Sequence, residues 1–460
     1  MQDASGAAQI RIMTQDYLHA ALLEAKVPRY TSYPPATRFS DAIGPARHGG
    51  WLATLPADEA ISLYAHVPFC RRLCWFCACR TQGTTNAAPL ARFLDTLEAE
   101  ARLVARTIGR RQKVASLHLG GGTPTLLSAG QMARLNGILR QSFDLDGCKD
   151  ISVEIDPCEL DDARLDALSA LGLSRASIGV QDFDPLVQDA IGRHQSAEIT
   201  ADAVAGLRSR GVRSVNFDLL YGLPHQTKAR LAATLDAVIG HRPDRIALYG
   251  YAHVPWMAKR QRLIPEDALP DPEARIALAD LARAQLVAAG YLPIGIDHYA
   301  LPGDEMAAAA RTGALRRNFQ GYTTDRAETL VALGPSAISR FREGYGQNAS
   351  ATRDWTVSVE NGCLPTSRGY ALSAEDCLAA DAIERVMCDG ILDFAALAQR
   401  HKLPADHLID RAAAALSDLP GMGGIADGIL SLTDMRYARL MAARIDPGMA
   451  EDVGRFSMAS

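Results

Sequence analysis

The sequence predicts an α/β fold built on a parallel (β/α) barrel or partial barrel. From residue 61 onward, six short apolar segments alternate with segments of helical periodicity. Successive strand–helix units of this kind place their strands in parallel, with the chemistry at the carboxyl ends of the strands. A cysteine-rich loop leaves the first strand at that end, which is where a barrel binds its cofactor.

The elements follow in order from their periodicity. Strands are expected at 61–66, 114–119, 151–156, 175–181, 214–220 and 245–251. Helices are expected between them at 90–108, 129–141, 161–171, 197–210 and 228–239. We therefore assign residues 51–355 to the barrel. Residues 1–50 are expected to form an N-terminal arm with a helix at 17–27, and residues 356–460 a mostly helical domain.

The C-terminal domain shows helical segments at 374–388, 394–400 and 406–417, and Ser373 is a suitable N-cap for the first. Two short strands are expected around a turn at 427–428, followed by a helix from Asp434. This order suggests a winged-helix-like unit. Because residues 373–445 hold seven Lys and Arg against eleven Asp and Glu, DNA binding is disfavoured. A lid over the site or a structural support fits better.

The composition is that of an ordinary globular protein. The chain has 460 residues, of which 48% are hydrophobic and 22% charged, and its formal net charge is -5. No apolar run reaches the roughly 18 residues of a membrane span, and the first residues lack the features of a secretory signal. No basic run indicates nucleic acid as a partner. We therefore expect a cytoplasmic protein, and a monomer by default.

Four of the nine cysteines lie in one stretch, CRRLCWFCAC, as Cys70, Cys74, Cys77 and Cys79. Disulfides are disfavoured because most of these cysteines are too close in sequence for relaxed bridges. A structural zinc site usually takes two cysteine pairs separated by a longer loop. An iron–sulfur cluster takes several thiolates from one tight loop. The cluster is the favoured interpretation, and zinc remains the alternative.

The CxxxCxxC part of this stretch resembles the radical S-adenosylmethionine (SAM) enzymes. In those enzymes three thiolates hold three irons of a [4Fe–4S] cluster, and the fourth iron binds the amino and carboxylate groups of SAM. One electron from the cluster then splits SAM into methionine and a 5′-deoxyadenosyl radical. The spacing alone is only moderately specific.

Strand alternation separates the side chains into two sets. If the apolar set packs against the outer helices, Tyr64, Glu154, Gln181 and Asp218 point into the barrel. Buried polar groups need partners, which are either a ligand or one another. The three glycines at 120–122 end the second strand. Such a run favours close approach of the backbone to a ligand, although a plain tight turn is the alternative.

Eight motifs occur in an order that resembles the oxygen-independent coproporphyrinogen III oxidases, radical SAM dehydrogenases of haem biosynthesis. They are YTSYP (30–34), LYAHVPFCRRLCWFCACR (63–80), LHLGGGTPT (117–125), VEIDP (153–157), IGVQDFD (178–184), DLLYGLP (218–224), YAHVP (251–255) and QGYTT (320–324). The resemblance spans residues 28–345, with a compatible tail ending in RFSMAS. It departs mildly at Trp75 and Ala78, where tyrosine and glycine are commoner.

The resemblance implies a partial (β/α)6 TIM-like barrel (the radical SAM fold), with an N-terminal extension and a mostly helical C-terminal domain. It implies that Cys70, Cys74 and Cys77 bind the [4Fe–4S] cluster, and that Cys79 is not a ligand but is needed for activity. Family members bind two SAM molecules. The implied contacts of the first are Tyr64, Gly121, Glu154 and Ile338. The implied contacts of the second are Phe76, Gly122, Thr123, Gln181, Arg193, Asp218 and Ala252.

The implied reaction converts coproporphyrinogen III to protoporphyrinogen IX by oxidative decarboxylation of two propionates to vinyls. The propionate β-carbon C–H is unactivated, so a side-chain base of ordinary pKa cannot remove its proton, whereas a primary carbon radical can take the hydrogen atom. An electron donor of the flavodoxin or ferredoxin type and a final electron acceptor are required. Arg29 and Arg316 or Arg317 are candidates for the substrate carboxylates, with solvated surface arginines as the alternative.

Two rivals share the radical SAM fold: a haem chaperone and a haem-modifying enzyme. Cys79, YTSYP and QGYTT favour the dehydrogenase, whereas stoichiometric haem binding would favour either rival. A zinc-stabilised binding protein is the remaining alternative.

Overall fold

The computed structural model describes residues 18, 20–23, 26–319 and 321–449. They form two compact units that interleave along the sequence. The barrel unit contains residues 39–270 and 325–371. The terminal unit contains the described residues up to 38, residues 271–324 and the described residues from 372 on. The predicted domain ranges 1–50, 51–355 and 356–460 stay a prediction, and residues 271–324 fall in the terminal unit.

Six parallel strands form the centre of the barrel unit, in the order of the sequence. They are β1 (Ile61–Val67), β4 (Val114–Gly121), β5 (Asp150–Ile155), β6 (Arg175–Gln181), β7 (Ser214–Tyr221) and β8 (Arg245–Gly250). Among the described strands β1 and β8 are not neighbours, so the barrel is partial. The predicted α/β architecture is confirmed, and the predicted strand ends lie within two residues of the observed ones.

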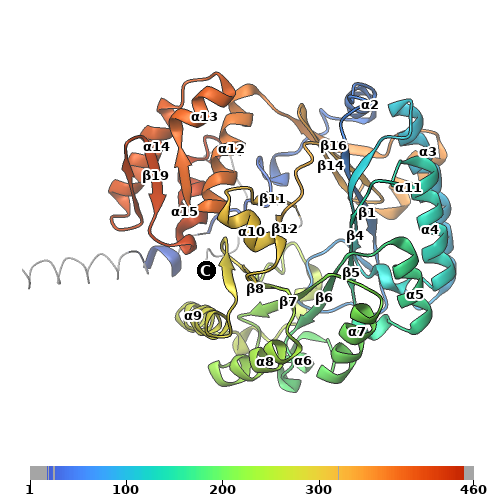
Figure 1. Ribbon diagram of the computed structural model, residues 1–460, viewed down its shortest axis with the longest axis horizontal. Helices are drawn as coiled ribbons and strands as arrows, with labels where there is room; N and C mark the ends of the chain where they lie inside the picture. Colours follow the sequence, from blue (N-terminus) through green and yellow to red (C-terminus); the bar gives the residue numbers. More distant parts are fainter. Residues whose placement is uncertain (1–17, 19, 24–25, 320, 450–460) are drawn as a thin grey trace, which may run out of the picture. The chain divides into compact units, whose positions relative to one another are not determined.

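The helices cover the outer side of this sheet (Figure 1). They are α3 (Ala87–Ile108), α4 (Ala129–Ser142), α5 (Asp162–Leu171), α6 (Pro185–Ile191), α7 (Ala197–Ser209) and α8 (Lys228–His241). Local chemistry sets their ends: Ser128 and Gln131 form a capping box at α4, and Gly172 ends α5 in the left-handed conformation. The apolar strand residues, such as Val153 and Phe217, are fully buried. The short helix α6 was not predicted.

Four further strands extend the sheet beyond β1. Strand β13 (Leu330–Leu333) pairs in parallel with β1, and three antiparallel strands follow it. These are β14 (Ile338–Phe341), β15 (Gly344–Asn348) and β16 (Thr366–Ala371). Helices α2 (Pro45–Ala53) and α11 (Thr352–Glu360) belong to the same unit. These strands were not predicted, because they are short and two of them contain glycines.

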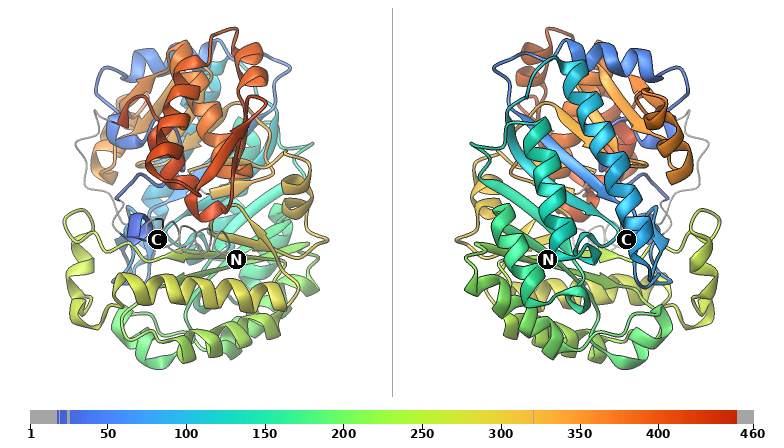
Figure 2. Two further views of the ribbon diagram at one scale, coloured as in Figure 1. Left: turned by 90° about the vertical axis from the view of Figure 1, so that its left-hand side faces the viewer. Right: turned by 90° about the vertical axis from the view of Figure 1, so that its right-hand side faces the viewer.

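In the terminal unit, the described residues up to 38 are followed by α9 (Pro272–Ala288) and by the hairpin of β9 (Leu292–Ile294) and β10 (His298–Ala300). Helix α10 (Glu305–Arg311) and the hairpin of β11 (Arg316–Asn318) and β12 (Gly321–Thr323) follow. The C-terminal elements are α12 (Ala374–Asp389), β17 (Ile391–Asp393), α13 (Phe394–His401), α14 (Asp406–Asp418), β18 (Gly423–Ala426), β19 (Ile429–Leu432) and α15 (Ala438–Ile445). Figure 2 shows β18 and β19 beside these helices.

The structure therefore contains the C-terminal helices and the hairpin that the sequence predicts, with Ser373 in a capping box at α12. Strand β17 was not predicted, and it completes a three-stranded sheet with β19 and β18. The winged-helix-like assignment stays a prediction. The predicted helix at 17–27 lies partly outside the described residues, of which 18 and 20–23 are helical. The tail RFSMAS lies outside them entirely. Over the described residues, no helix is both long enough and apolar enough to cross a membrane.

Candidate active site

The cysteine loop follows β1, and hydrogen bonds from two other segments of the barrel unit hold it. The backbone N–H of Trp75 donates to the carbonyl of Ile191 at 2.9 Å. The Gln261 side chain donates to the carbonyl of Phe76 at 2.7 Å. Arg260 donates to the hydroxyl of Thr81 at 2.9 Å and to the carbonyl of Cys79 at 3.4 Å. The loop is thus fixed at the carboxyl end of β1, as the sequence predicts.

The four thiols of the loop lie close enough to influence one another. Cys74 is buried, Cys70 and Cys77 are half-buried, and Cys79 is exposed. The side chain and backbone N–H of Cys79 both donate to the Cys77 sulfur, which lowers the pKa of Cys77 to about 6 despite burial. Burial, with the neighbouring Cys77 and Cys74, raises the pKa of Cys70 to about 11.

These residues fit an iron–sulfur cluster by the chemistry of their donors. Three thiols from one loop match the ligand set that such clusters take. Among the residues that the structure describes, no three His, Cys, Asp or Glu side chains converge as ligands of a single metal ion. A cluster does not need that convergence, because its thiolates are distributed over several irons.

A polar group built on Glu154 lies inside the barrel beside the loop. Glu154 accepts from the backbone N–H of Gly121 at 2.9 Å, and its other oxygen lies 3.3 Å from His118 Nε2. Burial alone would raise the pKa of Glu154, but His118 and the Gly121 N–H hold it below its ordinary value. The Tyr64 ring stacks on His118 at 5.6 Å, and its hydroxyl is 3.0 Å from His66 Nδ1. Glu154 is therefore a carboxylate at neutral pH.

A second polar group lies on β6 and β7. Asp218 accepts from the Ser177 hydroxyl and from the Asn216 amide, both at 2.8 Å. Asn216 Oδ1 is buried and has no hydrogen-bond partner among the described residues. Gln181 ends β6 with a positive φ of 68°, where the register to β7 shifts. Gln181 and Asp218 therefore lie on adjacent strands.

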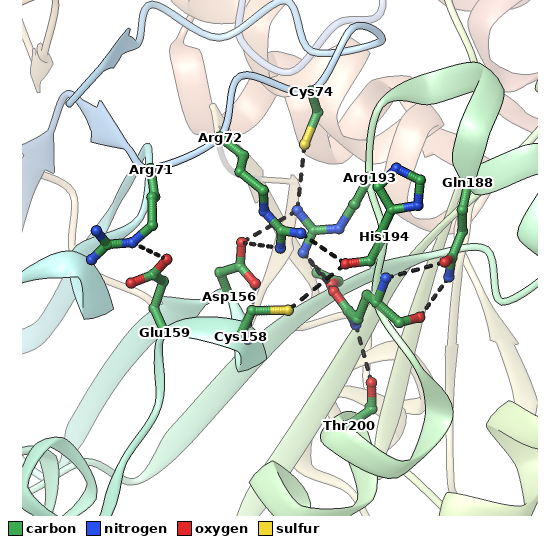
Figure 3. A network of polar contacts seen from close by, with 12 residues as sticks. Arg71, Arg72, Cys74, Asp156, Cys158, Glu159, Gln188, Arg193, His194 and Thr200 are labelled. Atoms are coloured by element: carbon green, nitrogen blue, oxygen red, sulfur yellow. Dashed lines mark hydrogen bonds and ion pairs between the residues drawn. The ribbon is translucent and has the colours of Figure 1, made fainter. Parts of the chain in front are cut away.

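Arg193 connects this region to the cysteine loop, as Figure 3 shows. Its guanidinium donates to the Cys74 sulfur at 3.6 Å and to the carbonyl of Gly179 at 2.7 Å. It also lies 3.6 Å from the carboxylate of Asp156. Its Nε is buried and has no hydrogen-bond partner among the described residues. Such an unpartnered donor fits a site that takes a further polar group.

The three glycines at 120–122, of which the first two end β4, are needed because protein groups, rather than open space, face them. A Cβ on Gly120 would lie 2.7 Å from a Glu154 oxygen, and one on Gly122 would collide with the backbone of Phe69. Gly121 has a φ of +107° and faces the His66 ring. The groups that these glycines approach in the structure belong to the chain itself, and the predicted approach to a ligand stays a prediction.

The other predicted contacts are spread around the same sheet. Thr123 is buried, and its N–H donates to the carbonyl of Phe69 at 2.7 Å. Phe76 packs on the apolar cluster around Leu223. Ala252 lies just beyond β8, and its carbonyl accepts from Gln261 at 3.1 Å. Ile338 opens β14 on the other side of β1.

The arginines considered for the substrate carboxylates have partners within the terminal unit. Arg316 pairs with Glu384 at 3.0 Å. Arg317 is buried, lies 4.0 Å from Asp297 and donates to the carbonyl of Tyr30 at 3.1 Å. The backbone carbonyl of Arg29 accepts from Arg317 at 3.5 Å. None of the three carries an assignment to the substrate here.

Sequence reasoning missed several residues of this site. The alternation of β4 could have identified His118, because it places His118 on the same face as Gly120. Asp156 shares a face with Glu154, and its two arginine partners could not be predicted. Arg260 and Gln261 follow β8, about 180 residues after the loop that they hold, and no local pattern marks such a contact.

The radical SAM superfamily model matches residues 64–238. The chain is 54% identical over 368 residues to an oxygen-independent coproporphyrinogen III oxidase of Paracoccus denitrificans, covering 80% of this chain and 82% of the relative. It is 47% identical to "Coproporphyrinogen III oxidase, anaerobic 1" of Cereibacter sphaeroides, covering 95% and 98%. The structure resembles that of the Escherichia coli coproporphyrinogen III oxidase HemN, titled a radical SAM enzyme. The TM-score is 0.86 at 35% identity, covering 92% of this chain and 100% of that one.

Proposed function

Because this chain belongs to the oxygen-independent coproporphyrinogen III oxidase family of the radical SAM superfamily, we propose that it converts coproporphyrinogen III to protoporphyrinogen IX without oxygen. The reaction is the oxidative decarboxylation of two propionates to vinyls. One observation carries the proposal: at the carboxyl end of the parallel sheet, the carboxylate Glu154 lies close enough to the cysteine loop for its charge to act on Cys77 and Cys79. This is where a barrel enzyme has its chemistry.

The [4Fe–4S] cluster is assigned to Cys70, Cys74 and Cys77. Held by these three thiolates, the cluster would supply the electron for the reductive cleavage of SAM, which provides the hydrogen-atom acceptor that the reaction needs. Cys79 is kept as a non-ligand residue needed for activity. Its exposure and its hydrogen bonds to Cys77 support this distinction, because Cys79 interacts with a proposed ligand from outside the CxxxCxxC set.

Two SAM molecules are proposed for each chain. The first is assigned to Tyr64, Gly121, Glu154 and Ile338. The second is assigned to Phe76, Gly122, Thr123, Gln181, Arg193, Asp218 and Ala252. The buried and unpartnered Arg193 Nε and Asn216 Oδ1 support a further polar ligand here. The ionised Glu154 is suited to accept hydrogen bonds from the amino and hydroxyl groups that SAM carries.

The chain's own residues orient these groups and keep water away from the reaction. The hydrogen bonds that Trp75, Gln261 and Arg260 make support the role in orientation, because they fix the cysteine loop. A flavodoxin- or ferredoxin-type protein is proposed as the electron donor, and the final acceptor is left open. We also propose that the protein is cytoplasmic, because a reducing compartment keeps the free thiols of the loop available for iron. A monomer is proposed as the oligomeric state.

The test is an anaerobic assay of the reconstituted protein with SAM, a reductant, coproporphyrinogen III and a cell extract that supplies the electron acceptor. Chromatography of the oxidised products is expected to show protoporphyrin, formed by loss of two carboxyl groups. Cys79→Ser should abolish this product, whereas Cys363→Ser, which changes an exposed cysteine outside the loop, should not. Stoichiometric haem binding without decarboxylation would overturn the proposal in favour of a haem chaperone or haem-modifying enzyme.

A further inference from the structure

A buried cation lies against one of the loop sulfurs. Arg193 follows α6, is only 8% exposed, and donates from Nη1 to Cys74 Sγ at 3.6 Å. Figure 3 shows its guanidinium directed at Cys74, with Asp156 beside it. Hydrogen bonds to the sulfurs of iron–sulfur clusters are among the factors that set their reduction potentials. The contact therefore concerns the electron transfer that the proposed reaction needs.

The guanidinium is held in place by several partners. Its Nη2 donates to the carbonyl of Gly179 at 2.7 Å and to the side chain of Gln195 at 2.8 Å. Gln195 is itself fixed, because it donates to the hydroxyl of Thr200 at 3.1 Å and its N–H donates to Gln188 at 3.1 Å. A planar guanidinium with this many partners has little freedom to leave Cys74.

Asp156 links this guanidinium to the cysteine loop. Its carboxylate lies 3.6 Å from Arg193 and 3.6 Å from Arg72, which stands between Cys70 and Cys74. The Asp156 side chain is 13% exposed, and its other oxygen accepts from the N–H of Cys158 at 3.1 Å. The backbone after β5 thus fixes the Asp156 carboxylate. This carboxylate in turn pairs with Arg72 of the loop and with Arg193 beside the loop.

The direction of the effect follows from charge. Reduction adds one negative charge to a cluster, so a cationic N–H donor at a ligand sulfur favours the reduced state. Burial increases the effect, because water does not screen the interaction.

We propose that Arg193 raises the reduction potential of the cluster through its hydrogen bond to Cys74, and that Asp156 is the positioning residue that holds Arg193 there. This inference rests on the proposed function, which makes Cys74 a cluster ligand. It leaves Arg193 Nε free for the second SAM, so the two roles of Arg193 use different atoms.

The same network offers a matched control. Glu159 lies three residues after Asp156 and pairs with Arg71, the neighbour of Arg72, at 2.6 Å. Figure 3 shows this pair on the side of the network away from Cys74. Glu159→Gln therefore removes an ion pair of the same kind, between the same two segments, without touching the group that reaches the sulfur.

The test is a redox titration of the reconstituted cluster in the absence of SAM, in which electron paramagnetic resonance monitors the reduced cluster. In Arg193→Gln and in Asp156→Asn, one-electron reduction should become about tenfold less favourable, a midpoint about 59 mV more negative. Glu159→Gln should match the unaltered protein. Removal of the negative charge of Asp156 would by itself raise the midpoint potential. A lower midpoint potential in Asp156→Asn therefore shows that the Arg193 guanidinium no longer lies at Cys74. Unchanged or raised potentials in both variants would overturn the inference.

A measurement on the apoprotein covers the case in which a variant does not assemble the cluster. Cys74 alkylation is followed by peptide mass spectrometry, with the buried Cys388 as an internal reference. Asp156→Asn should change the Cys74 rate several-fold, because Arg193 both covers this sulfur and favours its thiolate, and Glu159→Gln should leave the rate unchanged. Equal rates in both variants would contradict the positioning role. Absence of any cluster in the unaltered protein would instead overturn the proposed function.

Discussion

The thiols of the cysteine loop are not equivalent as single residues. Cys79 is exposed, whereas Cys74 is buried beside Arg193, and Cys77 accepts hydrogen bonds from Cys79. Thiolates rather than thiols bind iron. The hydrogen bonds from Cys79 lower the pKa of Cys77, which agrees with the proposal that Cys77, and not Cys79, is the ligand of this pair.

Single substitutions in the loop should separate the ligands from the fourth cysteine. We expect Cys70→Ser, Cys74→Ser and Cys77→Ser each to lose most of the iron bound after reconstitution, because each variant keeps only two of the three proposed thiolate ligands. Cys79→Ser should keep its iron but lose decarboxylation. Iron and sulfide analysis with the visible spectrum checks this. Full iron content in Cys74→Ser would contradict the ligand assignment.

Glu154 is the inward carboxylate that we propose as a contact of the first SAM. Glu154→Gln replaces a charged acceptor by a neutral amide, so SAM should bind roughly 10- to 100-fold more weakly, from about 1.5–3 kcal/mol for a charged hydrogen bond. Equilibrium dialysis with the reconstituted protein measures this. Asp150→Asn is the control, because Asp150 pairs with Arg175 at the opposite end of β5. Equal SAM affinity in the two variants would remove Glu154 from the site.

The sequence predicts which side chains of a strand point into the barrel, but it does not predict their hydrogen-bond partners on neighbouring strands. Alternation along one strand identifies Glu154 and Asp218 without any knowledge of neighbours. Their partners His118 and Ser177 depend on the register between strands, which tertiary packing sets. For the same reason, sequence could not decide between a ligand and an internal network. The structure has internal hydrogen bonds, and it also has buried polar atoms without a hydrogen-bond partner among the described residues, including Arg193 Nε and Asn216 Oδ1.

At the scale of elements, the glycine run fixes the end of β4 against the cysteine loop. Gly122→Ala would drive a methyl group into the backbone of Phe69, which cannot move without shifting Cys70. We expect a loss of about 2 kcal/mol of unfolding free energy, as for other overpacked sites, together with loss of cluster binding. Chemical denaturation of the apoprotein measures the first, and iron analysis the second.

Gly137→Ala is the matched control for that substitution. Gly137 lies inside α4, and a Cβ there meets nothing within 4 Å. Alanine has a higher helix propensity, so this variant should gain about 0.5–1 kcal/mol. If both variants were destabilised equally, the crowding at Gly122 would not be the cause.

Helix α3 is attached to the sheet extension through a buried carboxylate. Glu100 is 1% exposed and accepts from the Gly334 N–H at 2.8 Å, the Asn348 amide at 2.7 Å and the Trp355 indole at 3.1 Å. Burial outweighs these three donors and raises the pKa of Glu100 from 4.5 to about 7. The folded protein therefore keeps this proton to a higher pH than the unfolded chain does.

The sign of the pH dependence follows from that difference. Between pH 4.5 and 7 the unfolded chain binds fewer protons at Glu100, so this group lowers stability as pH rises, by up to about 3 kcal/mol in total. In Glu100→Gln the contribution should vanish. Denaturation curves of both proteins across this range measure the difference. An identical pH dependence would contradict the raised pKa.

Element-scale prediction worked where periodicity was long and failed where strands were short. Six strands and five helices of the barrel follow from their pattern, because strand burial and helical amphipathicity repeat over many residues. Strands β13 to β16 have four to six residues. Their position beside β1 follows from pairing across a long sequence separation, which no local pattern reports.

At the scale of the whole molecule, the two units differ from the predicted linear domains. Residues 271–324 follow the last barrel strand, so their helix and hairpins read as a continuation of the barrel. In the structure Leu315 and Tyr322 share an apolar cluster with Cys388 of α12, which places them in the terminal unit. Sequence patterns show that a residue is buried but not which core buries it.

The central claim for the whole molecule is that a hydrogen atom leaves a propionate β-carbon of the substrate and is taken up by the adenosyl fragment of SAM. The most direct measurement uses coproporphyrinogen III deuterated at those carbons, incubated anaerobically with the reconstituted protein, SAM, a reductant and an acceptor-containing extract. Mass spectrometry should find deuterium in 5′-deoxyadenosine, together with a product lacking two carboxyl groups. Deuterium-free 5′-deoxyadenosine beside unchanged substrate would contradict the claim.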